Sequence, residues 1–126
     1  RFQAAVMREV LETVEREYAE GVDGGKLANI AEYQDSFGFV AVIQAQYPAL
    51  SPAVQERDAE GDAEIVGALK KLGAAFTAVM PVEPLTPLAD VAEETDEVRS
   101  TIIVANELEA FAGSRCAPIS GGASLS

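Results

Sequence analysis

Carboxylates are the most plentiful side chains in this sequence that could do chemistry. Glu12 and Glu15 lie three residues apart, as do Glu32 and Asp35, and this spacing places each pair on one face of a helix. If the two segments run antiparallel across the glycine-rich turn at residues 21–25, Glu15 reaches the level of Asp35. Carboxylate oxygens suit hard or borderline cations such as iron, calcium or manganese. We therefore predict a metal site at Glu12, Glu15, Glu32 and Asp35; the alternative is a solvated acidic face.

The residue types that are missing exclude several classes of site. The sequence contains no histidine, which rules out histidine-based zinc and di-iron centres and Ser-His-Asp triads within the chain. Its one cysteine, Cys116, has no partner for an internal disulfide. We therefore expect that the protein is not an enzyme. The alternative, an acid/base site made only of carboxylates, stays open because the spacing of such a pair in the sequence is the same as that of ordinary surface carboxylates.

The net charge of −12 limits the partners of the chain. Asp and Glu number 21 against 9 Lys and Arg, and such a surface repels nucleic-acid phosphates while attracting cations or basic proteins. No run of 18 apolar residues occurs, so we expect no direct membrane insertion of this segment. Cations and basic partners are the ligands that the composition favours.

Apolar residues recur at three- and four-residue intervals through most of the chain, which is the helical period. The stripes fall at residues 2–20, 30–47, 62–79 and 88–112, with a polar helical stretch at 53–60. Four stripes joined by mostly short connections predict an all-α fold, an antiparallel up-down four-helix bundle over residues 1–112.

Helix ends are predicted from capping and breaking residues. Asn29 is expected to cap the second helix, Pro48 to end it, and Gly61 with its neighbour Asp62 to interrupt the following segment. Three prolines between residues 80 and 87 predict an extended connection. Residues 113–126, rich in Gly and Ser, are expected to form a flexible tail or linker.

One stretch, residues 18–39, resembles the extracytoplasmic helical domain that precedes the membrane permease in bacterial members of the ferric-iron permease family. The positions that carry the resemblance are Tyr18, Val22, Gly25, Glu32, Tyr33 and Phe39. The match covers about one-sixth of the chain. The permease's own acidic transport motifs, of the Arg-Glu-x-x-Glu type, lie in membrane helices, and this sequence has no run of apolar residues long enough for one, so transport itself is not expected here. A chain that opens at Arg1, with its first methionine at Met7, is expected to be a processed product or a piece of a longer protein.

The resemblance implies a non-enzymatic accessory domain of an iron uptake system that binds a metal cation, with iron as that cation. The implied partners are a membrane permease domain or an associated uptake protein. The implied location is periplasmic or otherwise extracytoplasmic, tethered to the inner membrane. The alternative function is an acidic helical protein-interaction module with no metal role.

Overall fold

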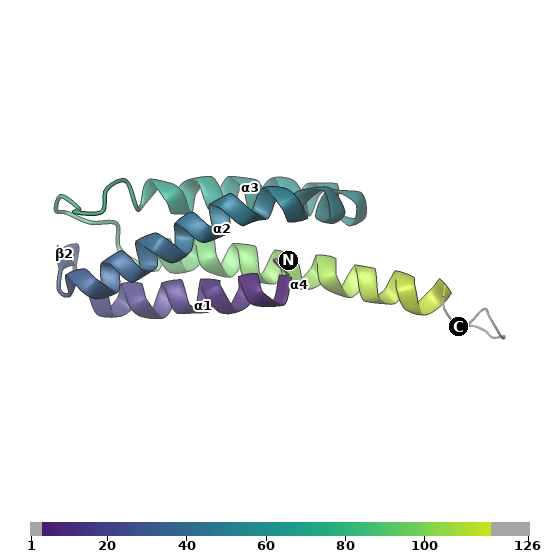
Figure 1. Cartoon of the computed structure of the whole chain (residues 1–126), viewed down its shortest axis with the longest axis horizontal. Helices are drawn as coiled ribbons and strands as arrows, with labels where there is room; N and C mark the ends of the chain where they lie inside the picture. Colours follow the sequence, from purple (N-terminus) through teal and green to yellow (C-terminus); the bar gives the residue numbers. More distant parts are fainter. Residues whose placement is uncertain (1–3, 117–126) are drawn as a thin grey trace.

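In the part of the chain that the structure describes, four helices run alternately up and down along one axis (Figure 1). The computed structural model describes residues 4–116, and side chains are described for residues 4–103. The helices are α1 (Ala4–Gly21), α2 (Ile30–Arg57), α3 (Ala59–Ala74) and α4 (Leu88–Cys116). α1 packs against α2 and α4, and α3 packs against the same two helices. The all-α, antiparallel four-helix bundle predicted from the sequence is confirmed.

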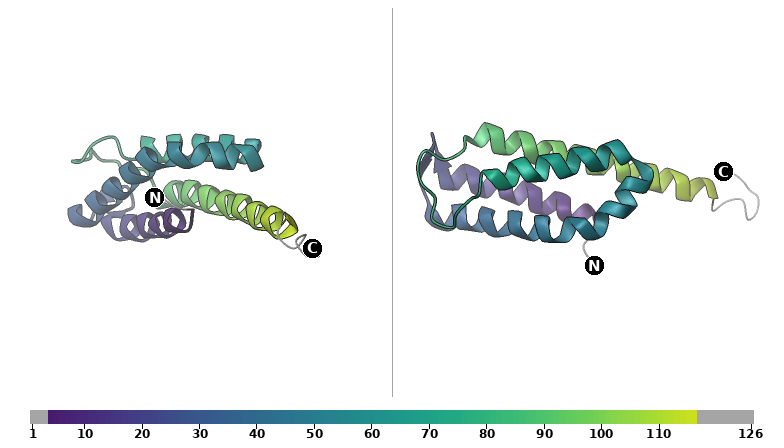
Figure 2. Two further views of the ribbon diagram at one scale, coloured as in Figure 1. Left: turned by 45° about the vertical axis from the view of Figure 1, so that its right-hand side comes forward. Right: turned by 90° about the horizontal axis from the view of Figure 1, so that it is seen from above.

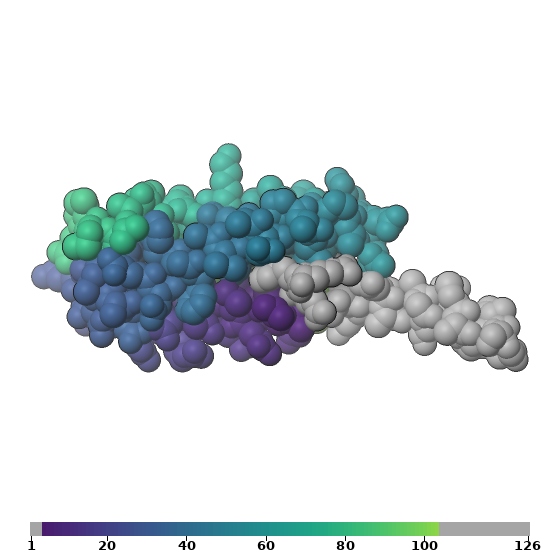
Figure 3. Space-filling model, viewed as in Figure 1, coloured from purple at the N-terminus to yellow at the C-terminus, as the bar shows by residue number. Residues whose placement is uncertain are grey.

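The predicted stripes form the core. Each lies on one face of its helix, so burying it removes a continuous apolar strip from water without burying the charged residues between. The side chains that are almost completely buried include Met7, Leu11, Val14, Tyr18, Tyr33, Val40, Ile43, Ile65, Leu72, Val91, Val98 and Ile102. Figure 3 shows α2 side chains filling the surface between α1 and α3 on one face.

The prediction that Pro48 ends the second helix is wrong. α2 continues through Pro48 and Pro52 to Arg57, and its last turns change direction to lead across to α3 (Figure 2, right). A proline removes one backbone hydrogen bond and bends a helix rather than always ending it. Here the burial of Tyr47 and Val54 on either side keeps the bent segment against the core.

The break between α2 and α3 falls at Asp58, not at Gly61 and Asp62 as predicted. Asp58 donates its backbone N–H to the Val54 carbonyl, 2.7 Å away, and its side chain accepts from the Gly61 N–H at 2.8 Å. Asp62 is instead buried in the first turn of α3. There its carboxylate accepts hydrogen bonds from the hydroxyls of Tyr47 and Ser51, each at 2.7 Å. These acidic residues build the corner between the two helices.

A short hairpin joins α1 to α2. Strands β1 (Val22–Asp23) and β2 (Lys26–Leu27) pair antiparallel around Gly24 and Gly25, which have φ angles of 57° and 80°. Two consecutive positive φ values are the backbone of a tight hairpin turn that glycine adopts without strain. The turn was expected from the glycines, whereas the two-residue strands were not. Asn29 caps α2 as predicted, accepting from the N–H groups of Ala31 and Glu32.

Residues 75–87 form a connection, here called the strap, that crosses the hairpin end of the bundle between α3 and α4 (Figures 1 and 2). The third apolar stripe was predicted to run to residue 79, but α3 ends at Ala74. Phe76 therefore lies in the strap, and its side chain is buried in the core. Phe76 packs on Tyr18 and Tyr33, with ring centroids 5.3 and 5.6 Å away. This aromatic cluster closes one end of the core.

α4 continues past the ends of the other helices at the opposite end of the molecule (Figure 1). Its helical backbone reaches Cys116, four residues beyond the predicted end. The rest of the predicted tail, residues 117–126, lies outside the described residues.

Candidate metal centre

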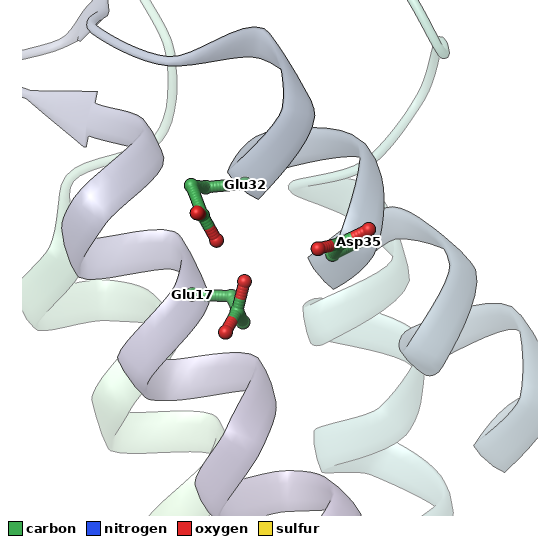
Figure 4. Close-up of side chains that lie close together, drawn as sticks. All are labelled: Glu17, Glu32 and Asp35. Atoms are coloured by element: carbon green, nitrogen blue, oxygen red, sulfur yellow. The ribbon is translucent and has the colours of Figure 1, made fainter.

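Three carboxylates converge on the outer surface where α1 and α2 meet. Glu17 comes from α1, and Glu32 and Asp35 come from the first turns of α2. Each offers an oxygen, and the three oxygens lie within 4.8 Å of one another. Figure 4 shows Glu17 and Glu32 pointing toward each other across the two helices, with Asp35 beside them. We call this group the carboxylate cluster.

The hairpin brings these side chains together. Gly21, at the end of α1, lies so close to α2 that an added Cβ would be 2.7 Å from the backbone nitrogen of Tyr33. Farther along the pair, the Ser36 hydroxyl donates to the Val14 carbonyl at 3.4 Å. These contacts fix which turns of the two helices lie opposite each other. Glu17 therefore faces the first turns of α2, where the two helices meet.

A shared hydrogen bond, partial burial and mutual repulsion together raise the pKa of Glu17 in the cluster. The hydrogen bond that protonated Glu17 shares with Glu32 contributes most to raising the pKa of Glu17. Partial burial and the negative charges of Glu32 and Asp35 raise that pKa further, whereas Arg16 lowers it. A carboxyl that holds its proton against like charges occupies a position where a cation would relieve the same repulsion.

The structure brings together two of the four residues predicted for the site. Glu32 and Asp35 are in the carboxylate cluster, but Glu15 faces α4, where it accepts a hydrogen bond from the Thr95 hydroxyl at 2.9 Å. Arg99 of α4 also lies 3.7 Å from the Glu15 carboxylate. Glu12 is exposed on α1. The prediction of which turns of α1 and α2 lie opposite each other was thus right. The prediction that Glu12 and Glu15 lie on the face of α1 that meets α2 was wrong.

Glu17 was missed by the sequence reasoning. It lies three residues after Val14, and the Val14 carbonyl contacts α2 through Ser36. Residues three apart on a helix share a face. The available signal was therefore the position of Glu17 beside the buried stripe, immediately before Tyr18, rather than its spacing from another acidic residue.

Two other groups of acidic residues lie elsewhere in the structure. Asp58 and Asp62 shape the corner between α2 and α3, as described above. Glu93, Glu94 and Glu97 line a shallow groove between α4 and α3 that also includes Lys71. Within residues 4–103, Glu17, Glu32 and Asp35 are the group whose carboxylate oxygens approach closely enough to share one cation.

Comparison with protein families agrees with this architecture. The family model described as iron permease-associated 4-helix bundle domain matches residues 1–109. The chain belongs to this family. Its members are not known as enzymes, and the family name associates the domain with an iron permease. The resemblance proposed from residues 18–39 is thereby confirmed at the level of the family.

No curated protein and no solved structure matches this chain. Across the described residues, each helix is too short or too polar to cross a bilayer. The family assignment is the functional link that the comparisons give.

Proposed function

We propose that this domain is a non-enzymatic accessory domain of an iron permease and that it binds a metal cation at the carboxylate cluster. The observation that carries the proposal is the convergence of Glu17, Glu32 and Asp35 from two helices, in a family associated with iron permeases. Iron is the cargo that we propose for the site. We place the domain on the extracytoplasmic side, tethered to the membrane through the permease.

The chemistry of the cluster fits transient binding. Three carboxylates supply oxygen ligands and up to three negative charges, which suits a hard cation. Glu17 and Glu32 are partly exposed and Asp35 is exposed, so a bound ion would keep water in its remaining positions. A hydrated ion held at the surface exchanges faster than one enclosed by protein ligands, which is the property that delivery to a transporter requires.

Cation and proton compete for the same oxygens. Because the pKa of Glu17 is raised by its hydrogen bond to Glu32 and by nearby negative charge, protonation of the cluster sets in at a higher pH than for an isolated glutamate. Metal binding requires the deprotonated ligand. Affinity should therefore fall as the pH drops, and the loss should begin above the usual glutamate range.

Calorimetric titration with ferric nitrilotriacetate and, separately, with Mn²⁺ tests the site. The double variant Glu17→Gln/Glu32→Gln keeps the side-chain volumes and removes two charges, and we expect its affinity to fall at least tenfold. Glu12→Gln is the matched control, since Glu12 is exposed on the same helix, and it should bind as the unmodified protein does. Equal affinities for the double variant and the control would refute the assignment.

A further inference from the structure

The middle of the strap presents apolar side chains to solvent. Val79, Met80 and Val82 are 50%, 67% and 85% exposed, whereas Phe76 and Leu85, nearer its two ends, are buried. The buried residues account for the contribution of the strap to the core. The three exposed residues contribute little to that core, so folding alone does not explain why this segment is apolar.

The neighbouring turn of α2 extends this surface. Gln34 donates to the Val79 carbonyl at 3.2 Å and lies 3.7 Å from the Met80 sulfur. Ile30, one turn earlier on the same helix face, is 36% exposed. We call the surface formed by Ile30, Val79, Met80 and Val82 the strap face.

Hydrogen bonds hold the strap in place. The Tyr18 hydroxyl donates to the Thr86 carbonyl at 2.6 Å and the Tyr33 hydroxyl to the Ala78 carbonyl at 2.8 Å. The Leu85 N–H donates to the Gly25 carbonyl at 2.8 Å, and three prolines restrict the backbone further. A surface that is already ordered loses little conformational entropy when a partner binds it.

Acidic residues predominate beside the strap face. Glu83 follows Val82 and its carboxylate accepts from the Leu27 N–H at 2.9 Å. Glu32 and Asp35 lie on either side of Tyr33 and Gln34 in α2. The hairpin at the same end of the bundle holds Asp23 and, opposite it, Lys26. An apolar centre with an acidic rim complements a protein surface that offers an apolar hollow bordered by lysine or arginine. It disfavours a membrane, because anionic headgroups repel such a rim.

We propose that the strap face is a docking surface for a basic extramembrane surface of the iron permease. This inference rests on the proposed accessory role but not on cation binding at the carboxylate cluster. The strap lies at the end of the bundle opposite to the start of α1 and to the end of α4 (Figure 1). The strap face is therefore far from both of these helix ends and accessible to a partner.

The test measures binding of the domain, immobilised through its C-terminus, to the purified permease in phosphatidylcholine nanodiscs. Val79→Asp/Val82→Asp should weaken binding at least tenfold and leave the circular dichroism spectrum unchanged. Val66→Asp is the matched control, because Val66 on α3 is also 50% exposed and lies outside the strap face; it should bind normally. Raising the salt concentration should weaken binding because it screens the acidic rim.

Equal losses in the strap and control variants, or equal binding to nanodiscs with and without permease, would overturn the docking proposal. Binding to phosphatidylglycerol vesicles without permease, abolished by Val79→Asp/Val82→Asp, would also overturn it and would identify a lipid surface instead. The variant Glu17→Gln separates this proposal from the cation site, because Glu17 belongs to the carboxylate cluster but is not among the residues of the acidic rim. If it loses cation affinity but still binds permease, both proposals hold; if it keeps cation affinity, only the metal assignment fails.

Discussion

Replacing Tyr18 by Phe should loosen the strap while leaving the aromatic core in place. The Tyr18 ring is fully buried and packs edge-on against Phe76, and Phe keeps that ring. The change removes the 2.6 Å hydrogen bond to the Thr86 carbonyl. Losing a hydrogen bond and leaving its acceptor without a partner costs about 1–2 kcal/mol. For a domain of this size, that cost lowers the unfolding temperature by roughly 5–10 °C.

Hydrogen exchange reports whether the loss is local. The Leu85 amide, bonded to Gly25, should exchange faster in Tyr18→Phe than the change in global stability accounts for. Tyr47→Phe is the matched control, because it removes a hydrogen bond of similar length, 2.7 Å, at the corner between α2 and α3. If both variants accelerate Leu85 exchange only in proportion to their global destabilisation, the strap is not held by Tyr18 and the reasoning is refuted.

Two further substitutions test the corner between α2 and α3 and the cluster. Asp62→Ala leaves the buried Tyr47 hydroxyl without its acceptor and should lower the free energy of unfolding in urea by about 2–4 kcal/mol. Glu60 is exposed in the same helical turn, so the control Glu60→Ala should lower it by less than about 1 kcal/mol. Similar losses in the two variants would contradict the role of Asp62. Glu17→Gln should raise the metal-free unfolding temperature at pH 7, because a folded-state pKa above the unfolded value means that ionised Glu17 destabilises the fold. That gain should shrink as the pH falls through the raised pKa, and an unchanged or lower unfolding temperature at pH 7 would contradict it.

The stripes could be predicted because each repeats over several turns, so that one irregular residue does not hide the period. Helix ends were less predictable because they depend on contacts distant in sequence. Pro48 is tolerated inside α2 because Tyr47 and Val54 return to the core on both sides of it. Phe76 continues the stripe of α3 but reaches the core from the strap, where it meets Tyr18 and Tyr33 from other helices.

The candidate site was only partly predictable, for a geometric reason. The length of the glycine-rich turn determines which levels of α1 and α2 are opposed, so the vicinity of Glu32 and Asp35 could be found. The face of α1 depends on how the helix is rotated, and each residue turns it by about 100°. Packing of α1 against α4 directs Glu15 toward Thr95 and Arg99, and Glu17 then faces α2. The spacing between the acidic residues of α1 carries no information about this rotation, whereas their position beside the apolar stripe does.

The carboxylate cluster and the strap are built from adjacent residues with opposite roles. Glu17 precedes Tyr18 in α1, and in α2 Glu32 and Asp35 enclose Tyr33 and Gln34. The carboxylates meet at the surface, while the tyrosines and Gln34 hold strap carbonyls. Because neighbouring helix residues share one backbone, any displacement of α1 relative to α2 would move both the carboxylates and the groups that hold the strap. The two proposed surfaces thus depend on the same turns of α1 and α2.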